Sequence, residues 1–179
     1  MKKVLKKKYT KIGILGGSFD PPHKGHLYIS KVALKKFKLS KLIWVVAKKN
    51  PHKKKPYLNT EIRIKLSKKL VKNEKKIFVK YLDDKIKSGK TFTLLNYILK
   101  KNKKIKIYFL MGADNFVKFH KWDNWQKIAK IANIVVFARK NYFTKAFNSI
   151  ASKKLKKNEW LYINSKKINI SSSIIRKFW

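Results

Sequence analysis

The sequence contains no cysteine, few acidic residues and no long apolar run. Without cysteine the chain forms neither disulfides nor a thiolate metal site, which is typical of a reducing compartment, and we expect a cytoplasmic protein. No apolar stretch reaches the roughly 18 residues of a membrane span. The run at residues 12–15 is too short for the core of a signal peptide. These absences argue against a disulfide-rich secreted domain and against a membrane protein.

Acidic residues and arginine are scarce, whereas lysine is abundant. Lys and Arg together number 48 against 8 Asp and Glu, which gives a net charge of +40. A nucleic-acid partner usually requires more arginine, and these lysines are spread along the whole chain. We therefore expect no dedicated nucleic-acid partner, and a positive field that attracts anionic nucleotides. The three arginines, Arg63, Arg139 and Arg176, mark positions where guanidinium geometry is needed.

Apolar runs of strand length alternate with amphipathic stretches of helical length, which predicts a doubly wound, mostly parallel sheet with helices on both faces. The expected strands are residues 11–15, 42–47, 77–82, 105–110, 134–138 and 160–163. The expected helices are residues 25–37, 60–71, 91–101, 125–131 and 172–177, with residues 143–157 ambiguous but favouring a helix. The length fits a single domain over residues 1–179, in which residues 1–10 form a flexible basic lead-in.

The most informative segment is GGSFDPPHKGH at residues 16–26. It follows an apolar strand and precedes a helix, so small residues bring backbone N–H groups and the positive end of a helix dipole together. Two histidines, His23 and His26, add donors at the same point. This arrangement predicts a phosphate site, with a nucleotide phosphate as the natural ligand. A tight turn with exposed histidines is the alternative, but a strand–helix junction that carries HxGH makes it less plausible.

This segment resembles the HxGH nucleotidyltransferases, and in particular the bacterial nicotinate-nucleotide adenylyltransferases, which implies a Rossmann-like fold. The resemblance implies that His23 and His26 are catalytic. It also places the ATP phosphates against the turn that follows the first strand. The ATP-binding residues expected there are Gly16, Gly17, Ser18 and Phe19.

Two further segments resemble motifs of the same family. The stretch MGADNFVKFHKW at residues 111–122 is similar to MGADNxxxFHxW, which implies that Asp114 belongs to the nucleotide site and that Trp122 stacks on the pyridine ring. The stretch ISSSIIR at residues 170–176 resembles ISSSxxR. Hydroxyls and N–H groups at a helix start, with an arginine one turn on, can hold the phosphates of ATP. The residues implied are Ser172, Ser173 and Arg176.

Less specific matches complete the mononucleotide site. The segment NPHK at residues 50–53 resembles a family loop whose basic residue reaches a substrate phosphate, which implicates Lys53, with His52 less certain. Thr91 opens a segment similar to TxDTL. There Thr93 and Leu94 replace the aspartate and threonine of the family, which leaves base recognition open. Arg139 falls where the family has an arginine near the site, whereas the sequence assigns no role to Arg63 or His120.

The resemblance implies adenylyl transfer from ATP to nicotinate mononucleotide, which yields nicotinate adenine dinucleotide and pyrophosphate. Mg²⁺ is expected to arrive with ATP, and no metal site built from protein side chains is expected. Within the class, the alternatives are nicotinamide mononucleotide or phosphopantetheine as the acceptor. From another class, the alternative is a basic RNA-binding protein without catalysis. The oligomeric state stays open.

Overall fold

The strands pair side by side into one sheet in which every neighbouring pair is parallel. The computed structural model describes residues 9–49, 55–165 and 170–178. Within these residues the strand order is β3-β2-β1-β4-β5-β6. The chain builds the sheet outward from β1 to β3, then returns to place β4 on the other side of β1 and continues outward to β6. The strands are β1 (Thr10–Gly17), β2 (Lys41–Val46), β3 (Ile77–Lys80), β4 (Ile105–Gly112), β5 (Ala132–Phe137) and β6 (Trp160–Ile163).

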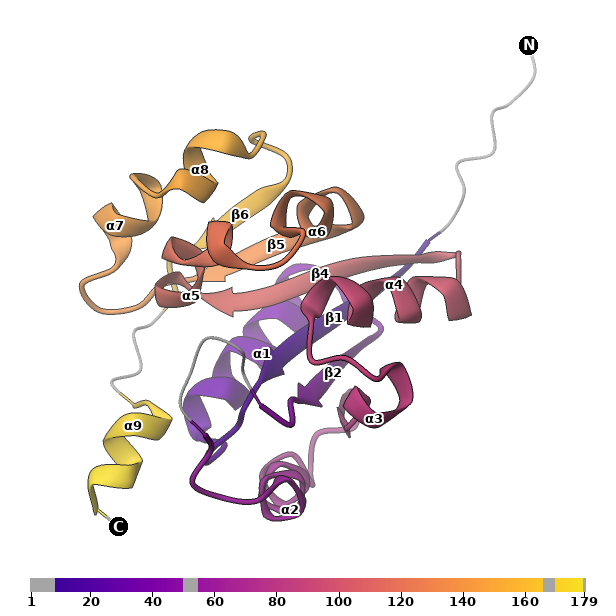
Figure 1. Cartoon of the computed structure of the whole chain (residues 1–179), viewed down its shortest axis with the longest axis vertical. Helices are drawn as coiled ribbons and strands as arrows, with labels where there is room; N and C mark the ends of the chain where they lie inside the picture. The colour runs from indigo at the N-terminus through magenta and orange to yellow at the C-terminus, as the bar shows by residue number, and fades with distance from the viewer. Residues whose placement is uncertain (1–8, 50–54, 166–169, 179) are drawn as a thin grey trace.

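Helices cover both faces of the sheet (Figure 1). Helices α1 (Lys24–Lys36) and α2 (Thr60–Leu70) pack on one face, where Ala33, Leu42 and Trp44 are buried. The other face is covered by helices that include α4 (Thr91–Lys101), where Leu95 is buried with Phe109 of β4. The remaining helices are α3 (Asp83–Ile86), α5 (Ala113–Val117), α6 (Trp125–Ile131), α7 (Phe143–Phe147), α8 (Ile150–Lys154) and α9 (Ser172–Ile175).

The expected fold class is confirmed, because the described strands form a doubly wound parallel sheet with helices on both sides. All six expected strands and the helices at 91–101 and 125–131 are present. The ambiguous stretch 143–157 contains two short helices, α7 and α8. The expected helix at 172–177 is α9 followed by a 3-10 helix (Arg176–Phe178). A short helix was expected after the strand that ends near Met111, and α5 confirms it. Helix α3 was not expected, because four residues are too few to show a helical period.

The N-terminal expectation needs one correction. Thr10 was assigned to a flexible lead-in, but it is the first residue of β1, and its N–H donates to the Lys104 carbonyl at 2.9 Å. Its Cα is also in register with Ile105 of β4. The sheet therefore begins earlier than hydrophobicity suggested, because backbone pairing at a strand end does not need an apolar side chain. The rest of the expected lead-in, residues 1–8, lies outside the described residues.

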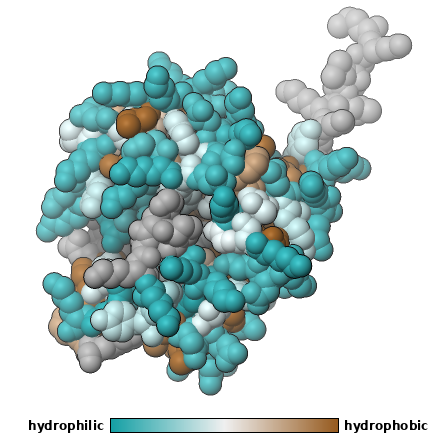
Figure 2. Space-filling view, in the orientation of Figure 1, coloured by the Kyte–Doolittle hydropathy of each residue, from teal (hydrophilic) through white to brown (hydrophobic). Residues whose placement is uncertain are grey.

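The described lysines are exposed. Figure 2 shows hydrophilic side chains over most of the face in view, with scattered apolar ones between them. This agrees with a charge that is spread along the chain. No described helix is both long and apolar enough to cross a bilayer.

Candidate active site

The turn after β1 brings both histidines to the start of α1. His23 is the N-cap of this 13-residue helix, and His26 lies in its first turn. The imidazole rings are stacked, with centroids 3.8 Å apart and an angle of 29° between their planes. The helix has no acidic residue in its first turn. Unpaired N–H groups and the helix dipole therefore act together with the two imidazoles at one point, which suits a phosphate.

Hydrogen bonds fix the orientation of His26. Its Nδ1 accepts the backbone N–H of His23 at 3.2 Å, so the neutral ring carries its proton on Nε2. On the buried side, the Trp44 indole N–H donates to Ser30 Oγ at 2.8 Å, and that hydroxyl donates to the His26 carbonyl at 2.8 Å. These two hydrogen bonds tie the first turn of α1 to Trp44 of β2. Nε2 is therefore the ring's N–H donor, the type of group that suits a phosphate oxygen.

The buried position of His23 favours its neutral form. Desolvation and, to a smaller extent, the positive charge of Arg139 lower the pKa of His23 to about 4. Its Nδ1 is buried and has no hydrogen-bond partner among the described residues. A buried polar atom without a partner is unfavourable unless a ligand or water satisfies it. The missing partner adds to the cost of burying this ring in its charged form.

We predict that His23 makes stability depend on pH. Its folded-state pKa lies below the ordinary value of 6.5, so below pH 6.5 the unfolded chain binds a proton that the folded chain refuses. The contribution of the neutral ring is complete above pH 6.5 and is lost as the pH falls toward 4. In His23→Asn the Tm should therefore fall less than in the wild type over this range. Thermal unfolding at several pH values from 7 to 4 measures this. An equal fall in Tm for the variant and the wild type would contradict the prediction.

The side chain of Phe19 is buried in the core. Its side chain is 2% exposed and stacks on Trp44, with centroids 5.0 Å apart. Its φ of 50° lies in the left-handed region, which an L side chain adopts at a cost and which here turns the chain toward α1. The ring is therefore part of the core and is not available to contact ATP. Only the backbone of Phe19 remains as a candidate for ligand contact.

Asp114 and Arg139 form an ion pair beside the histidines. The Arg139 guanidinium donates to Asp114 Oδ2 at 3.0 Å, while Oδ1 is buried and has no partner among the described residues. A carbon added at Gly112 would lie 2.6 Å from this Oδ1, so only glycine leaves room for the carboxylate. Asp114 can accept a ribose hydroxyl, as expected. Arg139 was expected to bind the mononucleotide, and its place near His23 suits the phosphate of that substrate better than the ring.

The C-terminal segment packs against the turn after β1. Ser172 Oγ donates to the Pro21 carbonyl at 2.8 Å. Arg176 donates to the Asp20 carbonyl, lies 3.5 Å from the Asp20 carboxylate and reaches Ser173 Oγ at 3.3 Å. Ser171 is the N-cap of α9, and its side chain accepts the N–H of Ile174. This first serine of the run therefore caps the helix. The tertiary structure thus brings the two expected ATP segments together, although they are about 150 residues apart in sequence.

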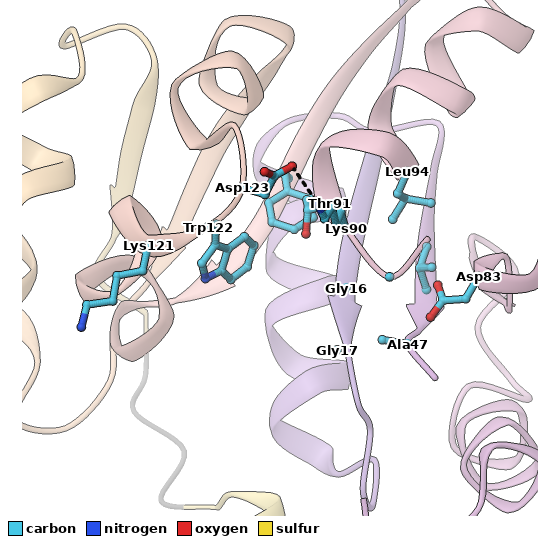
Figure 3. A pocket seen from close by; sticks show the side chains of 13 residues that line it. Gly16, Gly17, Ala47, Asp83, Lys90, Thr91, Leu94, Lys121, Trp122 and Asp123 are labelled. Atoms are coloured by element: carbon cyan, nitrogen blue, oxygen red, sulfur yellow. Dashed lines mark ion pairs between the residues drawn. The ribbon is translucent and has the colours of Figure 1, made fainter. Parts of the chain in front are cut away.

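A pocket of about 340 Å³ opens beside the ends of β1 and β2 (Figure 3). It is lined by Gly16 and Gly17 at the end of β1, by Thr91 at the start of α4 and by Trp122. The indole of Trp122 meets the rings of Phe109 and Phe119 edge-on, at 6.1 and 5.4 Å. These contacts orient the indole. Trp122 and Thr91, both expected in the mononucleotide site, therefore line one pocket.

Leu94 also lines this pocket, which bears on the departure from the TxDTL pattern. Its side chain is 7% exposed and belongs to the core behind α4. A leucine offers no hydrogen bond to a ligand. The wall formed by α4 is accordingly more apolar at this position than the threonine of the family pattern would make it.

Several residues at this edge of the sheet were not expected from the sequence. Asp83, Lys90 and Asp123 line the pocket, and Lys90 Nζ lies 3.7 Å from Asp123 Oδ2. Asp20 is 6% exposed, and its carboxylate accepts the N–H groups of Tyr57 and Leu58. The small number of acidic residues could have indicated them, because all five aspartates of this chain lie at this edge or beside it. They are Asp20, Asp83, Asp84, Asp114 and Asp123.

Three remaining residues contribute less. Lys53 and His52 lie outside the described residues, so the expected phosphate contact of Lys53 stays a prediction. His120 lies in the 3-10 helix (Phe119–Lys121), and its Nδ1 is buried without a partner in the described part of the chain. It does not line the pocket beside Trp122.

A metal site built from side chains is not found in the part of the chain that the structure describes, where no three His, Asp or Glu residues cluster suitably. The histidines, serines and arginine around the turn are donors suited to phosphate oxygens. Mg²⁺ prefers oxygen ligands and retains waters, and it commonly binds through substrate phosphates. The expectation that Mg²⁺ enters with ATP therefore fits this donor set and stays a prediction.

Comparison with known proteins agrees with this site. The cytidylyltransferase-like family model matches residues 14–178. A probable nicotinate-nucleotide adenylyltransferase of Pelagibacter ubique is 49% identical over 97% of this chain and 96% of its own length. A protein of the same name from Cereibacter sphaeroides is 30% identical over 92% of this chain and 96% of its own.

Solved structures show the same fold. The nicotinic acid mononucleotide adenylyltransferase of Plasmodium falciparum, complexed with NaAD, superposes with a TM-score of 0.73 at 22% identity, over 95% of this chain and 84% of its own. The family model covers most of the chain, and the Pelagibacter relative matches it from end to end. The chain therefore belongs to the nicotinate-nucleotide adenylyltransferases of the cytidylyltransferase-like family.

Proposed function

We propose that this chain transfers AMP from ATP to nicotinate mononucleotide and releases pyrophosphate. The observation that carries the proposal is the stacked pair His23 and His26 at the start of α1, next to a pocket lined by Trp122 and Thr91. The histidine pair suits phosphates and the pocket suits a flat ring, and the turn that follows β1 connects the two. The names of the relatives and the complex of the Plasmodium enzyme with NaAD support the same reaction.

The transfer needs positioning more than proton chemistry. An oxygen of the mononucleotide 5′-phosphate attacks the α-phosphorus of ATP, and the bond from that phosphorus to the bridging oxygen of pyrophosphate breaks. No covalent bond to the protein forms. Nε2–H of His26 and the N–H groups at the start of α1 stabilise the charge on the α-phosphate as its geometry changes. Mg²⁺, when bound with ATP, neutralises phosphate charge.

The remaining residues hold the two substrates. Arg176 and Ser173 lie one helical turn apart at the C-terminal segment, where they suit the leaving pyrophosphate. To bind it, Arg176 exchanges its contacts with Asp20 for phosphate oxygens. Asp114 Oδ1 accepts a ribose hydroxyl, and Trp122 stacks on the pyridine ring. The positive charge of the chain steers both anionic substrates to this edge.

Pyrophosphate release from Mg-ATP tests this proposal, with nicotinate mononucleotide, nicotinamide mononucleotide and phosphopantetheine supplied in parallel. Release with nicotinate mononucleotide alone supports it. Nicotinamide mononucleotide is the second candidate, because Leu94 gives the pocket an apolar wall where the family pattern has a hydroxyl. Release with that substrate would indicate relaxed base choice, whereas no release with any of the three would overturn the proposal.

A further inference from the structure

Arg63 of α2 is buried to 1% exposure, and all five of its N–H groups are used. Its hydrogen bonds reach three segments: the turn after β1, the end of β2 and the start of α2. The acceptors are the carbonyls of Leu58 (3.0 Å), Ser18 (2.7 Å), Ala47 (2.7 Å) and Lys48 (3.0 Å) and the hydroxyl of Thr60 (2.9 Å).

Two of these acceptors belong to different parts of the active site. Ser18 lies in the turn that leads to His23, and Ala47 lines the pocket beside Trp122. One nitrogen, Nη1, donates to both carbonyls. The Ala47 N–H also donates to the Gly17 carbonyl at 2.9 Å. The guanidinium therefore sets the distance between the phosphate turn and the ring pocket.

The same network extends to the C-terminal segment through Leu58. Its carbonyl accepts from Arg63, and its N–H donates to Asp20 Oδ1 at 3.0 Å. Asp20 in turn contacts Arg176. A shift at Arg63 would consequently move groups on both sides of the reacting phosphates.

We propose that Arg63 is a positioning residue for adenylyl transfer, which holds the phosphate turn and the ring pocket in the relative placement that in-line attack requires. The proposal rests on the proposed function. Arg63 donates four hydrogen bonds to backbone carbonyls and one to the Thr60 hydroxyl. It therefore acts through the residues that it holds in place. Attack distances are sensitive, and a displacement of about 1 Å can lower a rate about 10²-fold.

Arg63→Lys is the test, because lysine keeps the charge but has three N–H donors in place of a planar five-donor fork. We expect kcat to fall about 10²-fold, with the KM values for ATP and mononucleotide rising only several-fold. Lys65→Gln, an exposed change on the same helix, is the matched control and should leave both parameters unchanged. Rates are measured well below the Tm of each variant, with circular dichroism to show that each is folded.

The outcomes separate the two proposals. If Arg63→Lys is folded and its kcat is within twofold of the wild-type value, the positioning role is overturned. Arg63 would then contribute to stability only. If wild type releases no pyrophosphate with any acceptor, the proposed function fails instead. If Arg63→Lys does not fold, Thr60→Val replaces it, because valine removes one acceptor of Arg63 while keeping the side-chain shape. A smaller but clear loss of kcat is expected there, and unchanged kcat again overturns the proposal.

Discussion

Replacing His26 with alanine is expected to lower kcat about 10²- to 10³-fold, the usual cost of removing one preorganised donor to a developing charge. His26 Nδ1 accepts the His23 N–H, so the neutral ring carries its proton on Nε2 and can donate it to a phosphate oxygen. The effect should fall mainly on kcat, because the charge it stabilises is largest at the transition state. Steady-state pyrophosphate release at saturating substrates measures it.

The control for this variant is Lys36→Ala, an exposed change at the end of the same helix. Its kcat should match that of the wild type. Because the ring of His26 also packs against Phe19 and His23, the circular dichroism spectrum of His26→Ala must be compared with that of the wild type. A folded His26→Ala with near wild-type turnover would remove the histidine pair from the mechanism.

Trp122→Ala is expected to raise the KM for the mononucleotide, with a smaller change in the KM for ATP. Stacking between a base and an aromatic ring contributes about 1–3 kcal/mol, which corresponds to a roughly 5- to 150-fold change in affinity. The indole lines the pocket and is oriented by Phe109 and Phe119. Trp122→Phe, which keeps a smaller ring, should give an intermediate KM.

A matched control is Phe78→Ala, which removes a partly exposed aromatic side chain from β3, away from the pocket lining. Both KM values should stay unchanged in this variant. If Trp122→Ala changed the KM for ATP alone, the stacking assignment would be wrong. The pocket beside Thr91 would then belong to the adenine of ATP.

Much of the fold followed from local patterns. The apolar run before Gly16 and the helical spacing after His26 were enough to place β1 and α1 with small errors at their ends. The short helix α3 had no such pattern, because four residues form a helix only where the surrounding structure supports them. Phe19 shows the corresponding limit for the site, since its place in a ligand-binding motif did not reveal that its ring is buried against Trp44.

The arginines show how far scarcity alone can lead. Arg63, Arg139 and Arg176 stood out in a chain whose other basic residues are lysines, and each makes a defined contact at the same edge of the sheet. The sequence could not say what they contact. Their partners are backbone carbonyls and rare aspartates from segments far away along the chain. Asp20 was overlooked for the same reason, although it lies inside the leading motif.

The sequence by itself determined the parallel α/β architecture, the histidine pair and the family, because these depend on periodicity and on short contiguous motifs. The tertiary structure alone decided which motifs meet. It brought the C-terminal Arg176 onto Asp20, paired Arg139 with Asp114, and buried Arg63 between the ends of β1 and β2. The physical reason is that a parallel sheet gathers the carboxyl ends of distant strands at one edge. Contacts across that edge are set by packing, which local sequence does not encode.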